Sequence, residues 1–209
     1  MELPADWRWV FDLISPAPGR RMVATARHRD QLRKAAAVTP AAARNGTILG
    51  PIDRFLSSRY LTNRLRHDQL APFAVLFLQW ERRYPHEWTE AGTWTWSHWT
   101  SKELLLRRFA EAGVPIGVQR EVVELVGVAV AGPYRCKDWW YAQLARLVDG
   151  PPLRESIAAP LGSVVPLPRL RARFLLHVLD HPGIAIRRHT WHRWLSEQPG
   201  RDRRDIRNG

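Results

Sequence analysis

Several residue types that mark common protein classes are scarce in this chain of 209 residues. A single cysteine, Cys136, excludes an internal disulfide and any cysteine-rich zinc site. No apolar run reaches the roughly 18–20 residues of a membrane-spanning helix. The first residues lack the basic-then-apolar pattern of a signal peptide. We therefore expect a cytoplasmic protein.

Lysine is also scarce, and this bears on the meaning of the net charge of +12. Among 32 basic residues only Lys34, Lys102 and Lys137 are lysines, and a chain rich in Ala, Pro and Arg is what a GC-rich coding sequence produces without selection for binding. The surplus is uneven, since residues 15–50 contain seven basic residues and one acidic residue. Charge alone leaves two interpretations open, namely contact with nucleic acid and mere composition.

Sequence motifs for catalysis or cofactor binding are absent. The chain has no phosphate-binding glycine loop, no Gly-x-Ser-x-Gly elbow and no His-Glu-x-x-His motif. His177, His181, His189 and His192 lie close together in sequence, but no carboxylate or third ligand accompanies the last two convincingly, so a solvated or packed cluster is favoured over a metal site. We expect no cofactor and no metal, and we assign no catalytic residue.

Large apolar and aromatic residues are present in the amount that a folded core needs. Hydrophobic residues make up 45% of the chain, and 11 of them are tryptophans. Residues 1–14 contain an amphipathic stretch, expected to be a strap on the parent domain or a docking peptide for a partner. Residues 15–50 are expected to be a basic, mostly flexible linker, in which 23–37 could be helical. Residues 51–198 are expected to form a helical-repeat domain and 199–209 a basic disordered tail.

The first part of the helical domain contains two helical patterns and one unusual segment. Residues 51–66 predict an amphipathic helix, and residues 69–83 are apolar nearly all round, which predicts the most buried helix. Residues 86–100 are rich in tryptophan, and Trp94 and Trp96 fall on one side if the segment is extended. That side is either an aromatic platform for bases or the anchor of a long loop.

From residue 101 to 198 a short helical unit recurs about three times. Arg120, Arg154 and Arg188 are 34 residues apart, and each lies between a turn with Pro or Gly and an apolar run. This pattern is typical of stacked pairs of antiparallel helices. The helices expected from it span residues 104–112, 119–130, 137–148, 153–161, 170–179 and 186–197.

The last unit resembles a HEAT repeat. Asp180, Pro182, Ile186 and Arg187 carry the resemblance: an Asp near a Pro-containing turn, then an aliphatic residue followed by Arg, with one extra residue in the turn. Residues 149–154 repeat the pattern more loosely. The resemblance implies an all-α fold, a short α-solenoid of HEAT-like helix pairs with an N-terminal extension. It concerns architecture and not a particular function.

Asp138, Trp139 and Trp140 place a carboxylate beside two tryptophans. This is similar to the HEAT-like alkylpurine DNA glycosylases, in which Trp and Asp side chains on a basic concave face hold the damaged nucleotide. The three residues do not match that family's motif one by one. Trp140 is in register with Leu106 and Phe174 and is expected in the core, which leaves Asp138 and Trp139 nearer the surface. A glycosylase is retained as the second alternative, and Asp138 could equally cap the helix that it opens.

The main functional prediction is a non-catalytic helical-repeat protein that contacts the nucleic-acid backbone through arginine-rich surfaces. The residues expected to bind DNA or RNA are Arg107, Arg108, Arg120, Arg154, Arg187, Arg188, Trp94 and Trp96. For Arg120 and Arg154 a structural bond to a neighbouring turn explains the pattern equally well. The first alternative is a scaffold for a protein partner. A contiguous basic face favours nucleic acid, whereas an apolar or Trp-lined groove favours a protein.

Overall fold

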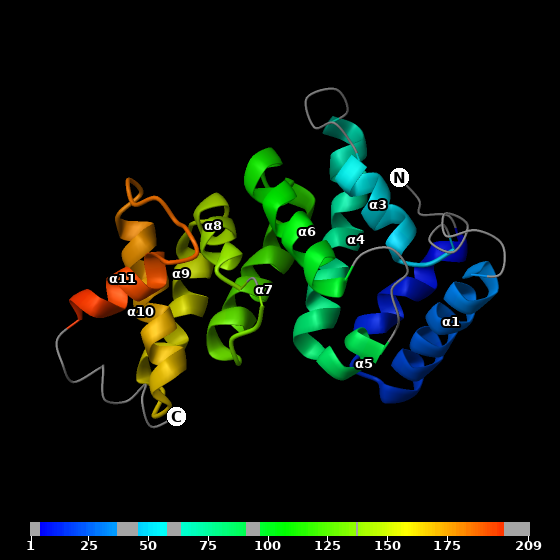
Figure 1. Cartoon of the computed structure of the whole chain (residues 1–209), viewed down its shortest axis with the longest axis horizontal. Helices are drawn as coiled ribbons and strands as arrows, with labels where there is room; N and C mark the ends of the chain where they lie inside the picture. Colours follow the sequence, from blue (N-terminus) through cyan, green and yellow to red (C-terminus); the bar gives the residue numbers. More distant parts are fainter. Residues whose placement is uncertain (1–4, 37–45, 58–63, 91–96, 137, 199–209) are drawn as a thin grey trace. The chain divides into compact units, whose positions relative to one another are not determined.

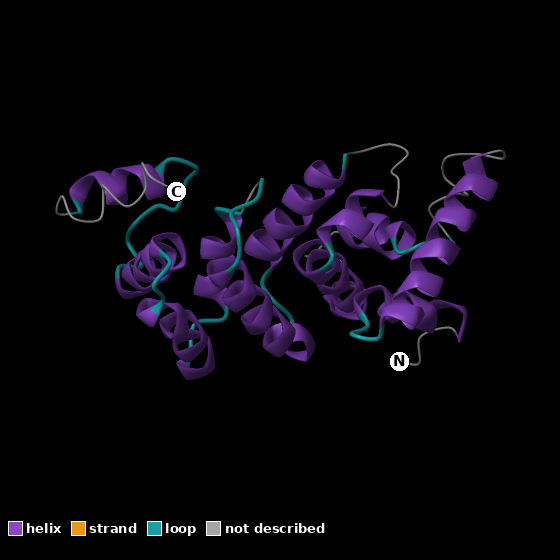
Figure 2. Cartoon of the chain, turned by 90° about the horizontal axis from the view of Figure 1, so that it is seen from below, coloured by secondary structure: helices purple, strands orange, loops and turns teal. Residues whose placement is uncertain are grey.

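The protein is all-helical in a computed structural model, and the part of the chain that the structure describes contains no β-strand (Figure 2). The described residues are 5–36, 46–57, 64–90, 97–136 and 138–198. None of the helices in these ranges combines the length and the apolar character that a membrane span requires. The prediction of an all-α chain is confirmed.

Two compact units divide the chain, and Figure 1 labels their helices. Unit 1 comprises Met1–Arg108 and Pro115–Val118, and unit 2 comprises Phe109–Val114 and Gln119–Gly209. The described helices of unit 1 are η1 (Ala5–Ile14), α1 (Pro18–Ala36), α3 (Leu49–Ser57), α4 (Arg64–Arg83), α5 (Pro85–Glu90), α6 (His98–Ala112) as far as Arg108, and η2 (Ile116–Val118). The helices described in unit 2 are α7 (Gln119–Ala131), α8 (Trp140–Leu147), α9 (Pro151–Ala158), η3 (Ala159–Gly162), α10 (Pro166–Asp180) and α11 (Thr190–Glu197).

Helix α4 forms the centre of unit 1. Every residue from Phe73 to Arg82 is buried, as the apolar pattern over residues 69–83 predicts. Helix α3 packs on α4 through Ile52 and Phe55, and the Phe55 ring stacks on the His67 ring with centroids 4.6 Å apart. The core of unit 1 is therefore aromatic as well as aliphatic.

The N-terminal 3₁₀ helix η1 lies against α1 and α4. Val10 and Leu13 are fully buried, and the rings of Trp7 and Phe11 have centroids 6.0 and 5.7 Å from that of Phe73. The segment therefore packs against helices of its own unit.

Helix α1 occupies residues 18–36, where the sequence favours a mostly flexible linker with a helical part over 23–37. The helix is longer than that part, and one side of it is buried. Its buried side chains are Ala24, Thr25, His28 and Leu32. Most of these are small or polar, so the apolar pattern of this segment is too weak to predict its burial. The later linker residues 37–45 lie outside the described residues.

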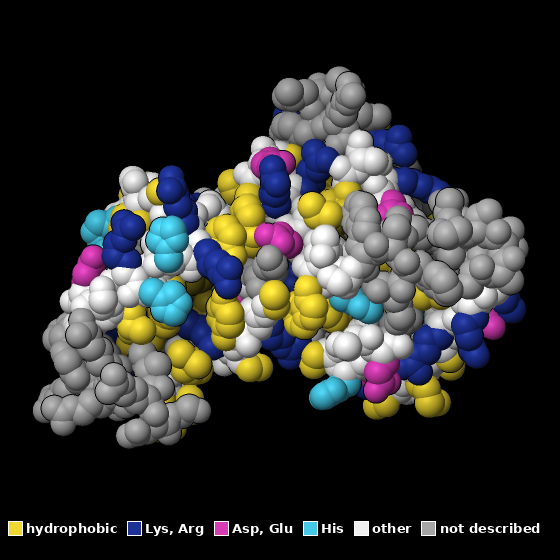
Figure 3. All heavy atoms as spheres, in the orientation of Figure 1, with side chains coloured by type: hydrophobic (Ala, Val, Ile, Leu, Met, Phe, Trp, Pro, Cys, Tyr) yellow, Lys and Arg dark blue, Asp and Glu magenta, His cyan; other side chains and the backbone are white. Residues whose placement is uncertain are grey.

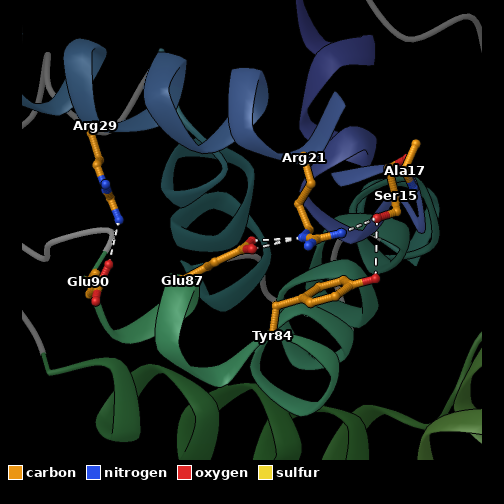
Figure 4. A network of polar contacts seen from close by, with 7 residues as sticks. All are labelled: Ser15, Ala17, Arg21, Arg29, Tyr84, Glu87 and Glu90. Carbon is orange, nitrogen blue, oxygen red and sulfur yellow. Dashed lines mark hydrogen bonds and ion pairs between the residues drawn. The ribbon is translucent and has the colours of Figure 1, made fainter. Parts of the chain in front are cut away.

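Charged side chains on α1 form contacts with residues of α5, as Figure 4 shows. Arg21 Nε lies 2.8 and 3.0 Å from the two carboxylate oxygens of Glu87, and the Arg21 guanidinium lies 3.8 Å from the centre of the Tyr84 ring. Arg29 Nη2 donates to Glu90 Oε2 at 3.0 Å. These contacts join α1 to residues more than sixty positions later, so they depend on the tertiary fold.

A buried ion pair joins α4 to α6. Lys102 Nζ lies 3.1 Å from Glu81 Oε2, and both side chains are fully excluded from solvent. The same ammonium group lies 5.5 Å from the centre of the Trp99 ring. Helix α6 begins at His98, six residues before the expected start, because Ser97 Oγ accepts a hydrogen bond from the Thr100 N–H.

Unit 2 is held together by contacts among α7, α8, α9 and α10. Helices α7 and α9 approach closely at Gly127, where an added Cβ would lie 2.1 Å from Ser156 Oγ. Helix α10 contacts each of the other three, and its residues Leu170, Ala172 and Val178 are fully buried. The helices of this unit lie close to the positions that the apolar periodicity predicts.

Candidate functional site

Unit 2 contains a pocket of about 370 Å³ between α7, α8, α10 and α11. Small-ligand sites typically enclose roughly 300–1,000 Å³. The polar side chains that line the pocket include Tyr134, Asp138, Tyr141, Arg171, Arg187, Arg188 and His192. In Figure 3, basic and histidine side chains lie beside apolar ones over the α10–α11 part of this unit. The pocket thus unites two arginines from the predicted site with two residues, Asp138 and Trp139, that belong to the glycosylase alternative.

Arg187 and Arg188 lie in the turn before α11 and not on the helix expected over residues 186–197. The helix starts at Thr190, and the hydroxyl of that residue accepts a hydrogen bond of 2.8 Å from the Arg187 N–H in the preceding turn. The same hydroxyl donates to a backbone carbonyl five residues upstream. Both arginine side chains are exposed at the pocket, and within the described residues neither forms an ion pair.

Helix α8 fixes this turn from the other side. Gln143 Nε2 donates to the carbonyl oxygen of Ile186 at 2.9 Å. One turn later Arg146 donates to the carbonyl oxygens of Val178 and His181, at the end of α10. These bonds satisfy carbonyls that the end of α10 and the turn leave without helical partners. The position of the two pocket arginines is therefore set by hydrogen bonds to the backbone around them.

Arg171 is the third arginine of the pocket and is largely buried, with 8% of its surface exposed. Its Nη1 donates to the Gly132 carbonyl oxygen, and its guanidinium lies 5.7 Å from the centre of the Tyr134 ring. Partial burial, followed by the charge of Asp138, raises the pKa of Tyr134. The hydroxyl is protonated at neutral pH, like that of an ordinary tyrosine, and can donate a hydrogen bond.

Aromatic rings form much of the wall, and each pocket tryptophan is supported by another ring. Trp139 stacks on Trp140 with centroids 4.3 Å apart and an interplanar angle of 28°. Trp191 contacts Phe174 edge-on at 5.3 Å and lies nearly parallel to Trp194 at 5.5 Å. Such pairs restrict side-chain rotation, so the wall is preformed.

Asp138 supplies the one carboxylate among the pocket residues, and 9% of its surface is exposed. Its Oδ2 accepts a hydrogen bond of 2.8 Å from the Arg135 N–H. The side chain therefore closes the turn before α8, and the residue that precedes α8, Trp139, provides no side-chain cap. Asp138 accordingly bonds backward along the chain and does not cap α8 in the manner that the sequence suggests.

The other repeat arginines of unit 2 have intramolecular partners. Arg154 bonds Asp149 through Nε at 2.8 Å and Asp180 through Nη1 at 2.7 Å, and these bonds raise its pKa above the ordinary value for arginine. Arg154 thus takes the structural role, because it joins two helix–turn aspartates. Arg120 is 88% exposed and lies 3.4 Å from Glu124, one helical turn away. Neither residue lines the pocket.

The remaining predicted residues belong to unit 1. Arg108 donates to the Leu56 carbonyl oxygen and so connects α6 to α3. Arg107 is exposed on α6. Trp94 and Trp96 lie outside the described residues.

Sequence reasoning missed Arg171, Tyr134 and His192 as pocket residues. Arg171 stands in an arginine-rich stretch of α10 and carries no local signal that separates it from Arg169 or Arg173. The spacing of the repeat places Trp191 three positions after Arg188, in the apolar run, which by itself indicates a packing position and not a pocket.

Among the described residues, no three His, Cys, Asp or Glu side chains are grouped as a metal site requires. Comparison of the chain with protein-family models, curated proteins and solved structures finds no match.

Proposed function

We propose that this protein is a non-catalytic helical-repeat protein that binds nucleic acid, with its main contact at the pocket of unit 2. The observation that carries the proposal is the meeting of Arg171, Arg187 and Arg188 with tryptophan rings around one pocket that contains a single carboxylate. Guanidinium groups hydrogen-bond phosphate oxygens, and aromatic rings stack on bases. The tryptophan lining by itself would also suit a protein partner, and the three arginines at the same pocket are what favour nucleic acid.

The proposed contact surface does not include all the arginines that the repeat predicts. The guanidinium group of Arg154 is engaged by two carboxylates and that of Arg108 by a carbonyl, so these side chains would have to give up bonds before they could contact a phosphate. Arg187 and Arg188 require no such exchange, because within the described residues they form no ion pair. The proposal therefore rests on the turn before α11.

The repeat architecture is part of the same proposal. Helices α8 and α9 are joined through Asp149, and α10 and α11 through Asp180, in a helix–turn–helix order that is HEAT-like. Arg154 supports this interpretation, because its bonds to both aspartates link corresponding turns of two successive helix pairs.

The test is fluorescence anisotropy of labelled single- and double-stranded DNA and RNA with the full chain, across a series of salt concentrations. The double variant Arg187→Gln/Arg188→Gln should weaken binding by about tenfold for each arginine that bonds a phosphate. On a single strand, the slope of log affinity against log salt should become shallower by about 0.7 for each such arginine.

A matched control removes the same charge elsewhere in unit 2. Arg120→Gln/Arg193→Gln alters two exposed arginines that do not line the pocket. This variant should retain most of the affinity. An equal decrease of affinity in the two double variants would mean that only net charge matters. Absence of binding to every nucleic acid would reject the proposal and favour the protein-scaffold alternative.

A second candidate function is removal of a damaged base, and one observation favours it. Asp138 and Trp139 line the same pocket as the three arginines, so a carboxylate and an aromatic ring lie beside side chains that could bind phosphate. In such a reaction the oxygen of water bonds to C1′ of the sugar, the N-glycosidic bond breaks with its electron pair leaving on the base, the proton lost by water passes to the Asp138 carboxylate, and an abasic site remains. Incubation with DNA that contains alkylated purines, followed by strand cleavage at abasic sites, tests it. If the unaltered protein forms no more product than the Asp138→Asn variant, the glycosylase alternative is rejected.

A further inference from the structure

The pocket of unit 2 has two kinds of surface, a wall of aromatic rings and a turn with two arginines, and contacts within the protein hold each of them in place. The tryptophan rings of Trp139 and Trp191 are each held by a neighbouring ring, at 4.3 and 5.3 Å respectively. The turn with Arg187 and Arg188 is held by the Thr190 hydroxyl. Neither surface has to be ordered by a ligand, so little of the binding free energy is spent on arranging the site.

The two surfaces differ in what they can bind. The ring wall is continuous with buried apolar side chains, among them Phe174 and Leu175, with 6 and 7% of their surfaces exposed. The arginine turn is exposed, at the solvent side of the pocket residues. A flat ring with an anionic group attached at its edge would satisfy both. The nucleotide unit of a nucleic acid has this composition.

A base inside a duplex cannot reach such a wall, because its faces are covered by the neighbouring base pairs. A base of a single strand can leave its neighbours at small cost and stack on a side chain. Building on the proposed function, we infer that the pocket receives one unstacked nucleotide of a single strand, with its base against Trp139 and Trp191 and its phosphate at Arg187 and Arg188. Arg171, fixed to the Gly132 carbonyl, adds a buried positive charge to the same pocket.

Three probes of equal length separate the base from the phosphates: a labelled oligodeoxyadenylate, the same sugar–phosphate strand without bases, and the oligodeoxyadenylate paired in a duplex. With the unaltered full chain, the base-bearing single strand should bind roughly 5- to 150-fold more tightly than the abasic strand, which is the range measured for one stacked base. The duplex should resemble the abasic strand. This comparison needs no variant, so it stands even if a tryptophan substitution impairs folding.

Substitutions then test which side chain produces the difference in affinity between the base-bearing and abasic strands. Trp139→Leu should abolish the difference between the base-bearing and abasic strands, and Trp139→Phe should keep most of it because a stacking face remains. Trp9→Leu, in unit 1, removes a tryptophan outside the pocket and should leave the difference unchanged. Circular dichroism confirms that each variant is folded before its affinities are compared.

The outcomes distinguish the inference from the proposed function. Equal binding of all three probes, reduced by Arg187→Gln/Arg188→Gln, would leave nucleic-acid binding in place and overturn the nucleotide pocket. No binding of any probe would reject both. If free deoxyadenosine monophosphate binds as tightly as the strand and depends on Trp139, the pocket holds a nucleotide as inferred, but its source is the free nucleotide and the proposed function fails.

Discussion

The buried ion pair of unit 1 gives the sharpest stability prediction. Lys102 and Glu81 lie 3.1 Å apart with both side chains fully excluded from solvent. Removal of one partner takes this ion pair away from the other charge, which stays in a medium of low polarity. We expect Lys102→Met, which keeps the apolar length of the side chain, to lower the free energy of unfolding by about 3–5 kcal/mol.

Removal of both charges should have a much smaller effect. Desolvation of two ions offsets most of their attraction, and replacement of a buried pair by apolar residues of similar volume is often neutral or stabilising by about 1–4 kcal/mol. Lys102→Met combined with Glu81→Leu should therefore recover most of the stability. The non-additivity of the two substitutions measures the coupling between the side chains.

Urea unfolding followed by tryptophan fluorescence and far-ultraviolet circular dichroism measures all four proteins of this cycle. Lys34→Met is the control, since Lys34 pairs with Asp30 on the surface of α1 at 76% exposure, and such pairs contribute at most about 0.5 kcal/mol. A destabilisation below about 1 kcal/mol for Lys102→Met would refute the reasoning, because a pair worth so little is hydrated in solution.

Three further predictions concern packing, a surface ion pair and pH. In a Ser156→Ala background, Gly127→Ala should stabilise the protein by about 1 kcal/mol through its higher helix propensity. In the native background the gain should be smaller, because the new Cβ would lie 2.1 Å from the Ser156 oxygen. Urea unfolding of the four proteins measures this coupling. Arg154→Ala should lower the melting temperature slightly at low salt and hardly at all in molar salt, where charges are screened beyond about 3 Å, and should leave nucleic-acid affinity unchanged. Burial, with smaller contributions from His98 and Arg29, lowers the pKa of His28 to about 4. Because the unfolded chain binds this proton near pH 6.5 and the folded chain does not, His28 should lower stability by up to about 3 kcal/mol from pH 6.5 to 4. Burial also lowers the pKa of His98 to about 4, so His28→Gln should remove only its own share of the pH dependence.

Helix positions could be predicted from the sequence wherever a helix buries large apolar residues. The pattern over residues 69–83 coincides with the buried part of α4, and that over 170–179 lies within α10. The burial of helix α1 could not be predicted in this way, because small or polar side chains line its buried face. Its attachment depends on Arg21 and Glu87, which are 66 residues apart and meet only in the folded protein.

The candidate site could be predicted only in part, for a related reason. The repeat points to Arg187 and Arg188, and adjacency points to Asp138 and Trp139, but nothing in the linear sequence connects the two pairs. Their meeting requires α8 and α10 to pack, and Arg171 enters the pocket through that packing alone. Helix α11 starts four residues after its predicted start, and the turn that replaces its first residues is bonded to the Thr190 hydroxyl, which periodicity does not indicate.

Arg154 and Arg188 show why an arginine count does not predict a binding surface. They occupy equivalent places in the repeat, 34 residues apart. Arg154 has Asp149 and Asp180 within hydrogen-bond distance, and both oxygens of the first carboxylate are bonded, so its charge is used to join two turns. Arg188 lies at a pocket whose lining contains one carboxylate, Asp138, which is bonded elsewhere to the backbone. The acids within reach of each arginine, and not its place in the repeat, decide which positive charge is available to a ligand.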